Sequence, residues 1–138
     1  MQTADPAPEP GPVVAYVPDL MDRSRIAAAA AAAGRRLVVA ASPAQLVALA
    51  GEPGATFLVD LSRPGATDVL AALPVERSVG FAGHVERDLI GRARAASGAT
   101  VLARSRLFAT LADVLGPGPA GGRSDAAERP EEGAGGQP

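Results

Sequence analysis

Several residues with useful chemistry each come directly after a short apolar run. They are Asp19, Asp60, Gly83, His84, Arg104 and Ser105. A carboxylate can bind a divalent cation or act as a nucleophile, and a guanidinium can hold a phosphate or carboxylate through two parallel hydrogen bonds. If the apolar runs are neighbouring parallel strands, the residues that follow them meet at one edge of a sheet, where open α/β sheets keep their ligand crevice. The sequence therefore predicts one polar site at that edge.

The elements that must position this site alternate between strand and helix. We expect strands at residues 13–17, 37–41, 56–61, 78–82 and 100–103, and helices at 20–33, 43–50, 67–73, 86–96 and 107–115, with a turn at 104–106. Short apolar runs are typical of parallel strands covered on both faces. Right-handed crossovers turn this alternation into a three-layer α/β/α sandwich of the flavodoxin-like class, with a five-stranded parallel sheet in the order 2-1-3-4-5.

Local signals agree with these boundaries. Ser42, Pro43 and Gln45 combine an N-cap, a first helical proline and a capping-box partner. Gly34 and Gly98 stand where helices should end in a left-handed residue. The first signal predicts where the second helix begins. The two glycines predict where the first and fourth helices end.

Composition sets limits on the class of protein. Of 138 residues, 47% are hydrophobic but only 3% aromatic, so the core must consist of aliphatic side chains, and there is no cysteine for a disulfide or thiolate site. A net charge of -2 without a cationic cluster argues against nucleic-acid binding. No apolar run is long enough to cross a membrane and the first residues do not resemble a secretory signal, so we expect a cytoplasmic protein. We expect disordered segments at 1–11 and 117–138 around a domain at 12–116.

The segment FLVDLSRPG, residues 57–65, resembles the end of the third strand in response-regulator receiver (CheY-like) domains. Asp60 stands in the place of the family's phospho-acceptor, and the likeness extends over residues 12–116. Residues 79–108, VGFAGHVERDLIGRARAASGATVLARSRLF, are also similar to a group of receiver-like bacterial proteins. The resemblance implies the receiver fold and a role in two-component signal transduction.

The chain departs from the receiver pattern at three places. The family's acidic pair, which holds Mg²⁺, corresponds to Pro18-Asp19, so the resemblance implies Asp19 and Asp60 as the metal ligands with one acid missing. The hydroxyl residue that ends the fourth strand corresponds to Ala82 or Gly83. The lysine that ends the fifth strand corresponds to Arg104, followed by Ser105, and a planar guanidinium does not replace an ammonium in a cramped site. These departures favour a degenerate receiver, or pseudo-receiver.

Individual residues keep alternative interpretations. Asp60 is a phospho-acceptor or caps a turn, and Asp19 and Asp22 are anions at a helix start or metal ligands, with Asp22 expected a turn too far along for the site. His84 contacts a ligand at the crevice rim or is a solvent residue at a helix entry. Arg104 binds an anion or pairs with Asp60. We expect a solvated helix face at Arg87, Arg92 and Arg94.

Three functional hypotheses follow. The first is a stand-alone pseudo-receiver that is not efficiently phosphorylated and binds a protein partner through its fourth helix, fifth strand and fifth helix. The second is a Mg²⁺-dependent phospho-accepting receiver that uses Asp60. The third is a small anion-binding module in which Arg104, Ser105, His84 and the backbone at Gly83 hold the ligand. We expect no enzymatic turnover and no nucleic-acid or membrane partner, and a homodimer stays an open alternative.

Overall fold

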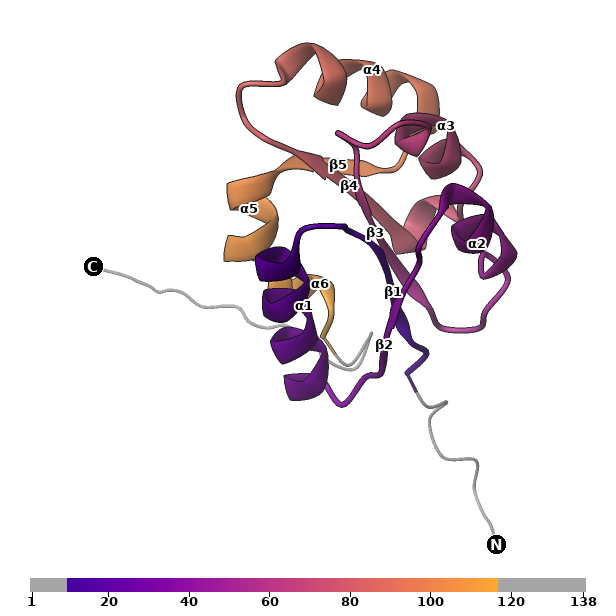
Figure 1. Cartoon of the computed structure of the whole chain (residues 1–138), viewed down its shortest axis with the longest axis vertical. Helices are drawn as coiled ribbons and strands as arrows, with labels where there is room; N and C mark the ends of the chain where they lie inside the picture. The colour runs from indigo at the N-terminus through magenta and orange to yellow at the C-terminus, as the bar shows by residue number, and fades with distance from the viewer. Residues whose placement is uncertain (1–9, 117–138) are drawn as a thin grey trace, which may run out of the picture.

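A parallel sheet forms the centre of the molecule. The structure is a computed structural model and describes residues 10–116. Its strands are β1 (Val13–Tyr16), β2 (Leu37–Val39), β3 (Thr56–Asp60), β4 (Ser78–Ala82) and β5 (Thr100–Ala103). They pair in parallel in the order β2-β1-β3-β4-β5, which confirms the predicted order (Figure 1). All the carboxyl ends of the strands consequently lie along one edge.

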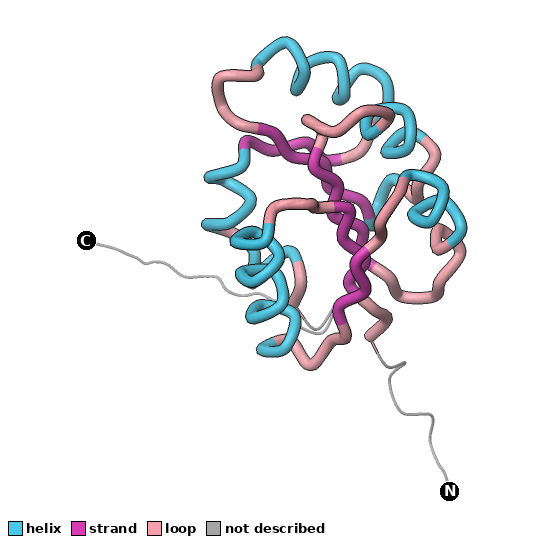
Figure 2. The backbone as a smooth tube through the Cα atoms, viewed as in Figure 1, coloured by secondary structure: helices cyan, strands magenta, loops and turns pink. Residues whose placement is uncertain are grey.

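Helices cover both faces of this sheet (Figures 1 and 2). They are α1 (Leu20–Ala32), α2 (Pro43–Ala48), α3 (Ala66–Ala71), α4 (Arg87–Ser97), α5 (Arg104–Ala109) and α6 (Leu111–Val114), with a short 3₁₀ turn at Val75–Arg77. One core cluster includes Ile26 of α1 and Leu107 of α5, and the other includes Leu46 of α2 and Ile90 of α4. The predicted three-layer sandwich is therefore confirmed.

The central strand β3 connects the two core clusters. Phe57 and Val59 belong to the cluster on the α2, α3 and α4 side, whereas Leu58 belongs to the cluster on the α1 and α5 side. All three side chains are fully buried. Successive residues of a strand point to opposite faces, so one short apolar run fills both layers of a sandwich. This strand carries Asp60 at its carboxyl end and holds that residue in a fixed place.

The predicted helix boundaries are largely confirmed by their capping contacts. The Ser42 hydroxyl accepts a hydrogen bond from the Gln45 N–H at 3.1 Å, and Gln45 Oε1 accepts one from the Ala41 N–H at 2.7 Å. Gly34 and Gly98 adopt φ values of 72° and 70°, the left-handed conformation that glycine adopts without a Cβ penalty. Local chemistry thus sets where these helices begin and end.

The segment after β5 differs from its prediction. Residues 104–106 were expected to form a turn and residues 107–115 a single helix, but α5 begins at Arg104 and ends at Ala109, and α6 follows. Ala103 is both the last residue of β5 and the extended N-cap of α5, so no residue is left between them to form a turn. Thr110 separates the two helices: its hydroxyl donates to the Arg106 carbonyl at 2.9 Å, a contact that bends helices.

Arg35 fastens the opposite, amino-terminal edge of the sheet, a role that its sequence position does not reveal. Its side chain is buried, and its guanidinium donates to carbonyls of Gly11 and Gly54 at 2.9 Å each, of Pro12 at 3.3 Å and of Leu115 at 3.5 Å. Burial lowers the pKa of this guanidinium from its ordinary value. One side chain therefore joins the segments before β1 and β3 to the end of α6.

Two further expectations concern the ends of the chain and the membrane. The expected disordered segments at 1–11 and 117–138 lie outside the described residues, apart from Pro10 and Gly11. Within residues 10–116, every helix is too short or too polar to cross a bilayer.

Candidate functional site

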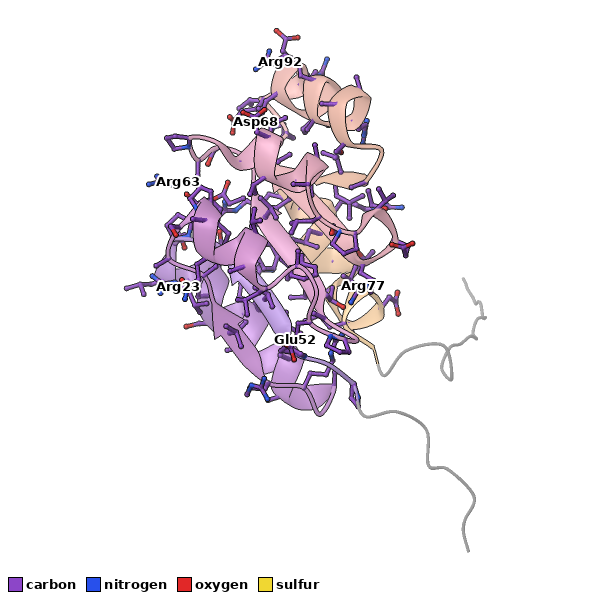
Figure 3. All side chains as sticks on the ribbon, turned by 90° about the vertical axis from the view of Figure 1, so that its right-hand side faces the viewer. Arg23, Glu52, Arg63, Asp68, Arg77 and Arg92 are labelled. Carbon is purple, nitrogen blue, oxygen red and sulfur yellow. The ribbon has the colours of Figure 1, made fainter. Side chains whose placement is uncertain are left out.

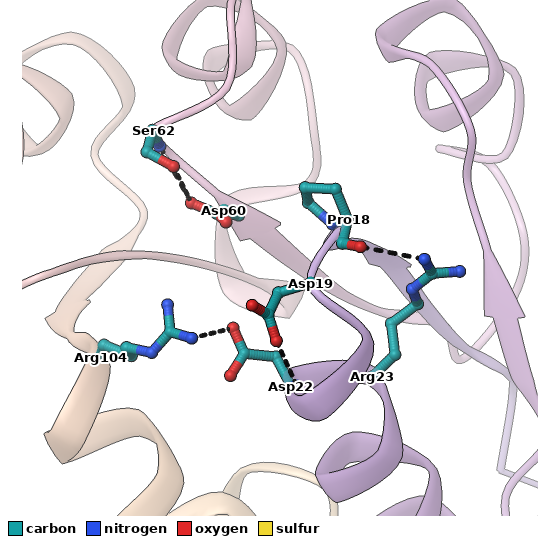
Figure 4. Close-up of polar contacts among 7 residues, drawn as sticks. All are labelled: Pro18, Asp19, Asp22, Arg23, Asp60, Ser62 and Arg104. Carbon is teal, nitrogen blue, oxygen red and sulfur yellow. Dashed lines mark hydrogen bonds and ion pairs between the residues drawn. The ribbon is translucent and has the colours of Figure 1, made fainter.

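Three carboxylates gather at the carboxyl edge of the sheet (Figure 4). Asp60 is the last residue of β3, Asp19 is the N-cap of α1, and Asp22 lies in the first turn of that helix. The charges of Asp19 and Asp60 both act on Asp22, so the three groups share one electrostatic environment. The sequence predicted the meeting of Asp19 and Asp60. Asp22, expected a turn too far along, joins them because residues three apart in a helix lie on the same side.

Asp22 is the most deeply buried of these carboxyl groups. It is only 2% exposed. Burial is the main reason that the pKa of Asp22 is raised above its ordinary value of 3.8, and the charges of Asp19 and Asp60 add to the rise. The cations Arg104 and Arg25 oppose it without cancelling it. The folded protein therefore holds a carboxylate at a position where its charge is costly.

Arg104 forms an ion pair with this buried carboxylate. Its Nη2 atom lies 2.5 Å from Asp22 Oδ2, and the Arg104 side chain remains 41% exposed. The contact is an ion pair and not an aligned hydrogen bond. Asp22 Oδ2 is buried and accepts no hydrogen bond from the described residues. The sequence left open a pairing of Arg104 with Asp60, but the partner in the structure is Asp22.

Asp60 is engaged by its own loop. It is 6% exposed, and its Oδ1 atom accepts hydrogen bonds from the Ser62 N–H at 3.0 Å and from the Ser62 hydroxyl at 2.7 Å (Figure 4). This is the turn-capping arrangement that was one of the two interpretations of Asp60. Ser62 was not singled out from the sequence, although the backbone N–H two residues after an aspartate is the usual partner in such a turn.

The fit of these carboxylates to Mg²⁺ is poor in this arrangement. Asp19 Oδ1 accepts the Asp22 N–H at 3.0 Å as a helix cap, Asp60 Oδ1 accepts two bonds from Ser62, and Asp22 is paired with Arg104. Across residues 10–116 no group of three or more His, Cys, Asp or Glu side chains is arranged to hold a metal ion. Mg²⁺ requires near-octahedral oxygen ligands. The Arg104 guanidinium would therefore have to leave Asp22 before the ion could bind.

A pocket of about 420 Å³ lies beside the acidic cluster. Its lining residues are Arg25, Gly83, His84, Arg104, Ser105, Phe108 and Ala109. The structure therefore brings together the four residues that the sequence proposed for an anion, namely Gly83, His84, Arg104 and Ser105. Of these, His84 is exposed at the rim.

Arg25 and Phe108 complete this pocket and were missed by the sequence analysis. The Arg25 guanidinium carbon lies 4.0 Å from the centre of the Phe108 ring, a cation–π contact. Phe108 packs edge-on against the buried Phe81, with ring centres 6.1 Å apart. Nothing in the sequence indicates this contact, because it depends on how α1 and α5 lie on the same face of the sheet.

A second, smaller pocket of about 260 Å³ lies at the ends of β1 and β2. Arg23 and Arg63 both line it, and Figure 3 shows them on the same side of the molecule. Arg23 Nη2 donates to the Pro18 carbonyl at 2.9 Å. This arginine thus supports the loop that carries Asp19.

The sequence predicted that the three arginines of α4 form a solvated face, and the structure confirms this only in part. Arg87 and Arg92 are exposed as predicted. Arg94 is also exposed, but its guanidinium donates twice to the Val101 carbonyl, at 2.8 and 3.2 Å. It therefore connects α4 to the edge strand β5.

Comparisons with known proteins give a relative among solved structures. Neither the protein-family models nor the curated proteins yield a match. The Rec1 domain of ShkA, in a crystal structure with c-di-GMP, is similar to this chain at 30% sequence identity with a TM-score of 0.53. The match covers 77% of this chain and 89% of that domain. The chain belongs to the response-regulator receiver family. This result confirms the resemblance drawn from FLVDLSRPG and places Asp60 at the end of the third strand of a receiver fold.

Proposed function

We propose that this receiver domain signals through contacts with a protein partner and is not phosphorylated efficiently on Asp60. The observation that supports the proposal is the ion pair between Arg104 and Asp22 at 2.5 Å. This pair fills the acidic cluster with a cation that belongs to the protein itself. A domain whose acidic site already holds a cation of its own can present its surfaces in one constant state.

The chemistry of aspartyl phosphorylation explains why this pair matters. The Asp60 carboxylate would attack a phosphoryl group, and a divalent cation would neutralise the phosphoryl oxygens during the transfer. Arg104 competes with such a cation for Asp22, while two hydrogen bonds from Ser62 occupy Asp60 Oδ1. The contact between Arg104 and Asp22 must be disrupted before a cation can take its place, which raises the barrier to transfer.

The partner surface that we propose consists of α4, β5 and α5. Within residues 10–116, β5 pairs with β4 alone and is an edge strand of the sheet. Arg94 already covers the Val101 carbonyl of that edge. Arg87 and Arg92 of α4 and Arg106 of α5 are exposed, so the partner expected here carries acidic groups.

Intact-mass measurement tests the absence of phosphorylation. We expect the full chain, incubated with acetyl phosphate and Mg²⁺, to keep its mass, because Arg104 and Ser62 hold the acidic site closed. The variant Arg104→Lys is a useful companion, since it restores an ammonium at this position. A phosphate mass that appears in the unmodified protein and is lost in Asp60→Asn would refute the proposal in favour of the Mg²⁺-dependent phospho-accepting receiver.

A second candidate function is the binding of a small anionic ligand in the pocket beside the cluster. Two guanidiniums, from Arg25 and Arg104, and the ring of Phe108 line the same 420 Å³ space. Cations and an aromatic face suit a ligand that carries both phosphate and a planar base. The related ShkA Rec1 domain was crystallised with c-di-GMP, which makes this compound the first ligand to test.

Isothermal titration of the full chain with c-di-GMP tests this candidate. We expect saturable binding that weakens in Arg25→Gln and in Arg104→Gln. Arg92→Gln is the matched control, because Arg92 is exposed on α4 and does not line the pocket (Figure 3). Absence of binding by the unmodified chain, or equal weakening by the Arg92 variant, would exclude recognition at this pocket.

A further inference from the structure

We propose that Asp22 sets the affinity of the pocket for phosphate-bearing ligands by competing with them for Arg104. The inference rests on the second candidate function, ligand binding in the pocket beside the acidic cluster. It assigns to Asp22, which does not line the pocket, the role of a residue that limits affinity.

Arg104 is shared between two places. It lines the pocket together with Arg25 and Ser105, and its Nη2 atom contacts Asp22 Oδ2 at 2.5 Å. The contact with Asp22 engages Nη2, so an anion that binds two parallel N–H groups including Nη2 competes with Asp22 for that nitrogen. Such an anion must draw Arg104 partly away from Asp22 to bind.

The two pocket arginines differ in how their charge is compensated. Arg25 lies over the Phe108 ring, and within residues 10–116 it forms no ion pair. Arg104 is already paired with a carboxylate. Arg25 acts on Asp22 only from a distance and more weakly than Arg104 does, so it keeps more of its charge for an anion, whereas the contribution of Arg104 depends on what Asp22 retains.

The burial of the pair makes the competition asymmetric. The Asp22 side chain is 3% exposed and the Arg104 side chain 41% exposed. When Arg104 turns toward the pocket, it exchanges its contact with Asp22 for contacts with water and ligand. Asp22 loses its counter-charge, and water cannot reach its carboxylate unless the fold opens. Ligand binding therefore carries the cost of leaving a buried charge unpaired.

The variant Asp22→Asn removes this cost while keeping the size of the side chain. We expect it to bind inorganic pyrophosphate and a purine nucleoside monophosphate roughly three- to tenfold more tightly than the unmodified chain, as the strength of partly exposed ion pairs implies. Comparison of the two probes separates recognition of the phosphate alone from recognition that also needs the base.

Two controls separate freed Arg104 from a general loss of negative charge. Asp19→Asn removes the same charge a short distance away and keeps the helix cap, since asparagine caps as well as aspartate, but it leaves the Arg104–Asp22 pair intact. We expect less than a twofold change in affinity, an allowance for the weaker effect of a more distant charge. In an Arg104→Gln background, Asp22→Asn should give no gain.

Titration calorimetry of these variants decides the proposal. Tighter binding by Asp22→Asn that vanishes in the Arg104→Gln background supports it. Equal or weaker binding by Asp22→Asn, a gain that persists without Arg104, or no binding of either probe by any variant overturns it. The candidate ligand function itself is judged separately, by the titration of the unmodified chain described above.

Discussion

Removal of Arg104 should make the stability of the domain depend more steeply on pH. The guanidinium is the largest of the influences that lower the pKa of Asp22, so Arg104→Gln raises that pKa further. A carboxyl group with a raised pKa in the folded state stabilises the fold most at pH values below its unfolded pKa, near 3.8, and this stabilisation is lost as the pH rises through the folded pKa. The variant and the unmodified protein should therefore be equally stable in acid and diverge toward neutral pH.

The exposure of the two partners sets the size of the effect. Fully exposed pairs contribute about 0.2–1 kcal/mol, and removing one partner from a fully buried pair costs about 3–5 kcal/mol. Because the Asp22 side chain is 3% exposed but the Arg104 side chain is 41% exposed, solvent screening discounts the larger value. We expect Arg104→Gln to lower the free energy of unfolding at pH 7 by about 1–2 kcal/mol, between these two limits.

Urea denaturation of the full chain at a series of pH values measures this difference. Arg106→Gln, two residues further along the same helix and exposed, is the matched control and should leave stability unchanged at every pH. In an Asp22→Asn background, Arg104→Gln should lose its pH-dependent effect. A destabilisation that is the same at pH 4 and pH 7, or that persists without the Asp22 carboxylate, would show that Arg104 acts through packing.

Other predictions concern stability away from this pair, each measured by urea denaturation. Replacing Arg35 by methionine leaves several backbone carbonyls without their donor and should cost about 2–4 kcal/mol, with lysine recovering only part of it. Gly80→Ala should cost about 1–3 kcal/mol, because a Cβ there would lie 2.7 Å from a Leu70 methyl and 3.1 Å from the Leu61 methyls. Ser42→Ala removes the cap of α2 and should cost about 1 kcal/mol. A neutral result for any of these would mean that the contact named is compensated elsewhere.

The sheet and its order could be predicted from the sequence because local patterns carry that information. Five short apolar runs separated by helix signals permit few arrangements once crossovers are right-handed. The caps at Ser42, Gly34 and Gly98 depend on neighbouring residues alone. Because the strand order was predictable, the edge of the sheet on which Asp19 and Asp60 meet was predictable too.

The partners of the charged side chains could not be predicted in this way. The pairing of Arg104 with Asp22 depends on the exact rotation of α1 and on α5 beginning without a turn, and both are set by packing against the sheet. The contact of Arg25 with Phe108 has the same origin. Sequence position identified Arg104 as important, but only the fold shows which carboxylate neutralises it.

We propose that Arg104 occupies the acidic cluster from within, so that Asp60 does not act as a phosphoryl switch. Thermal unfolding of the full chain with Mg²⁺, and then with Mg²⁺ and beryllofluoride, tests it most directly, because a ligand that binds only the folded state raises the melting temperature. We expect no shift in the melting temperature of the unmodified protein under either condition. A rise with Mg²⁺ that grows with beryllofluoride and disappears in Asp60→Asn would contradict it.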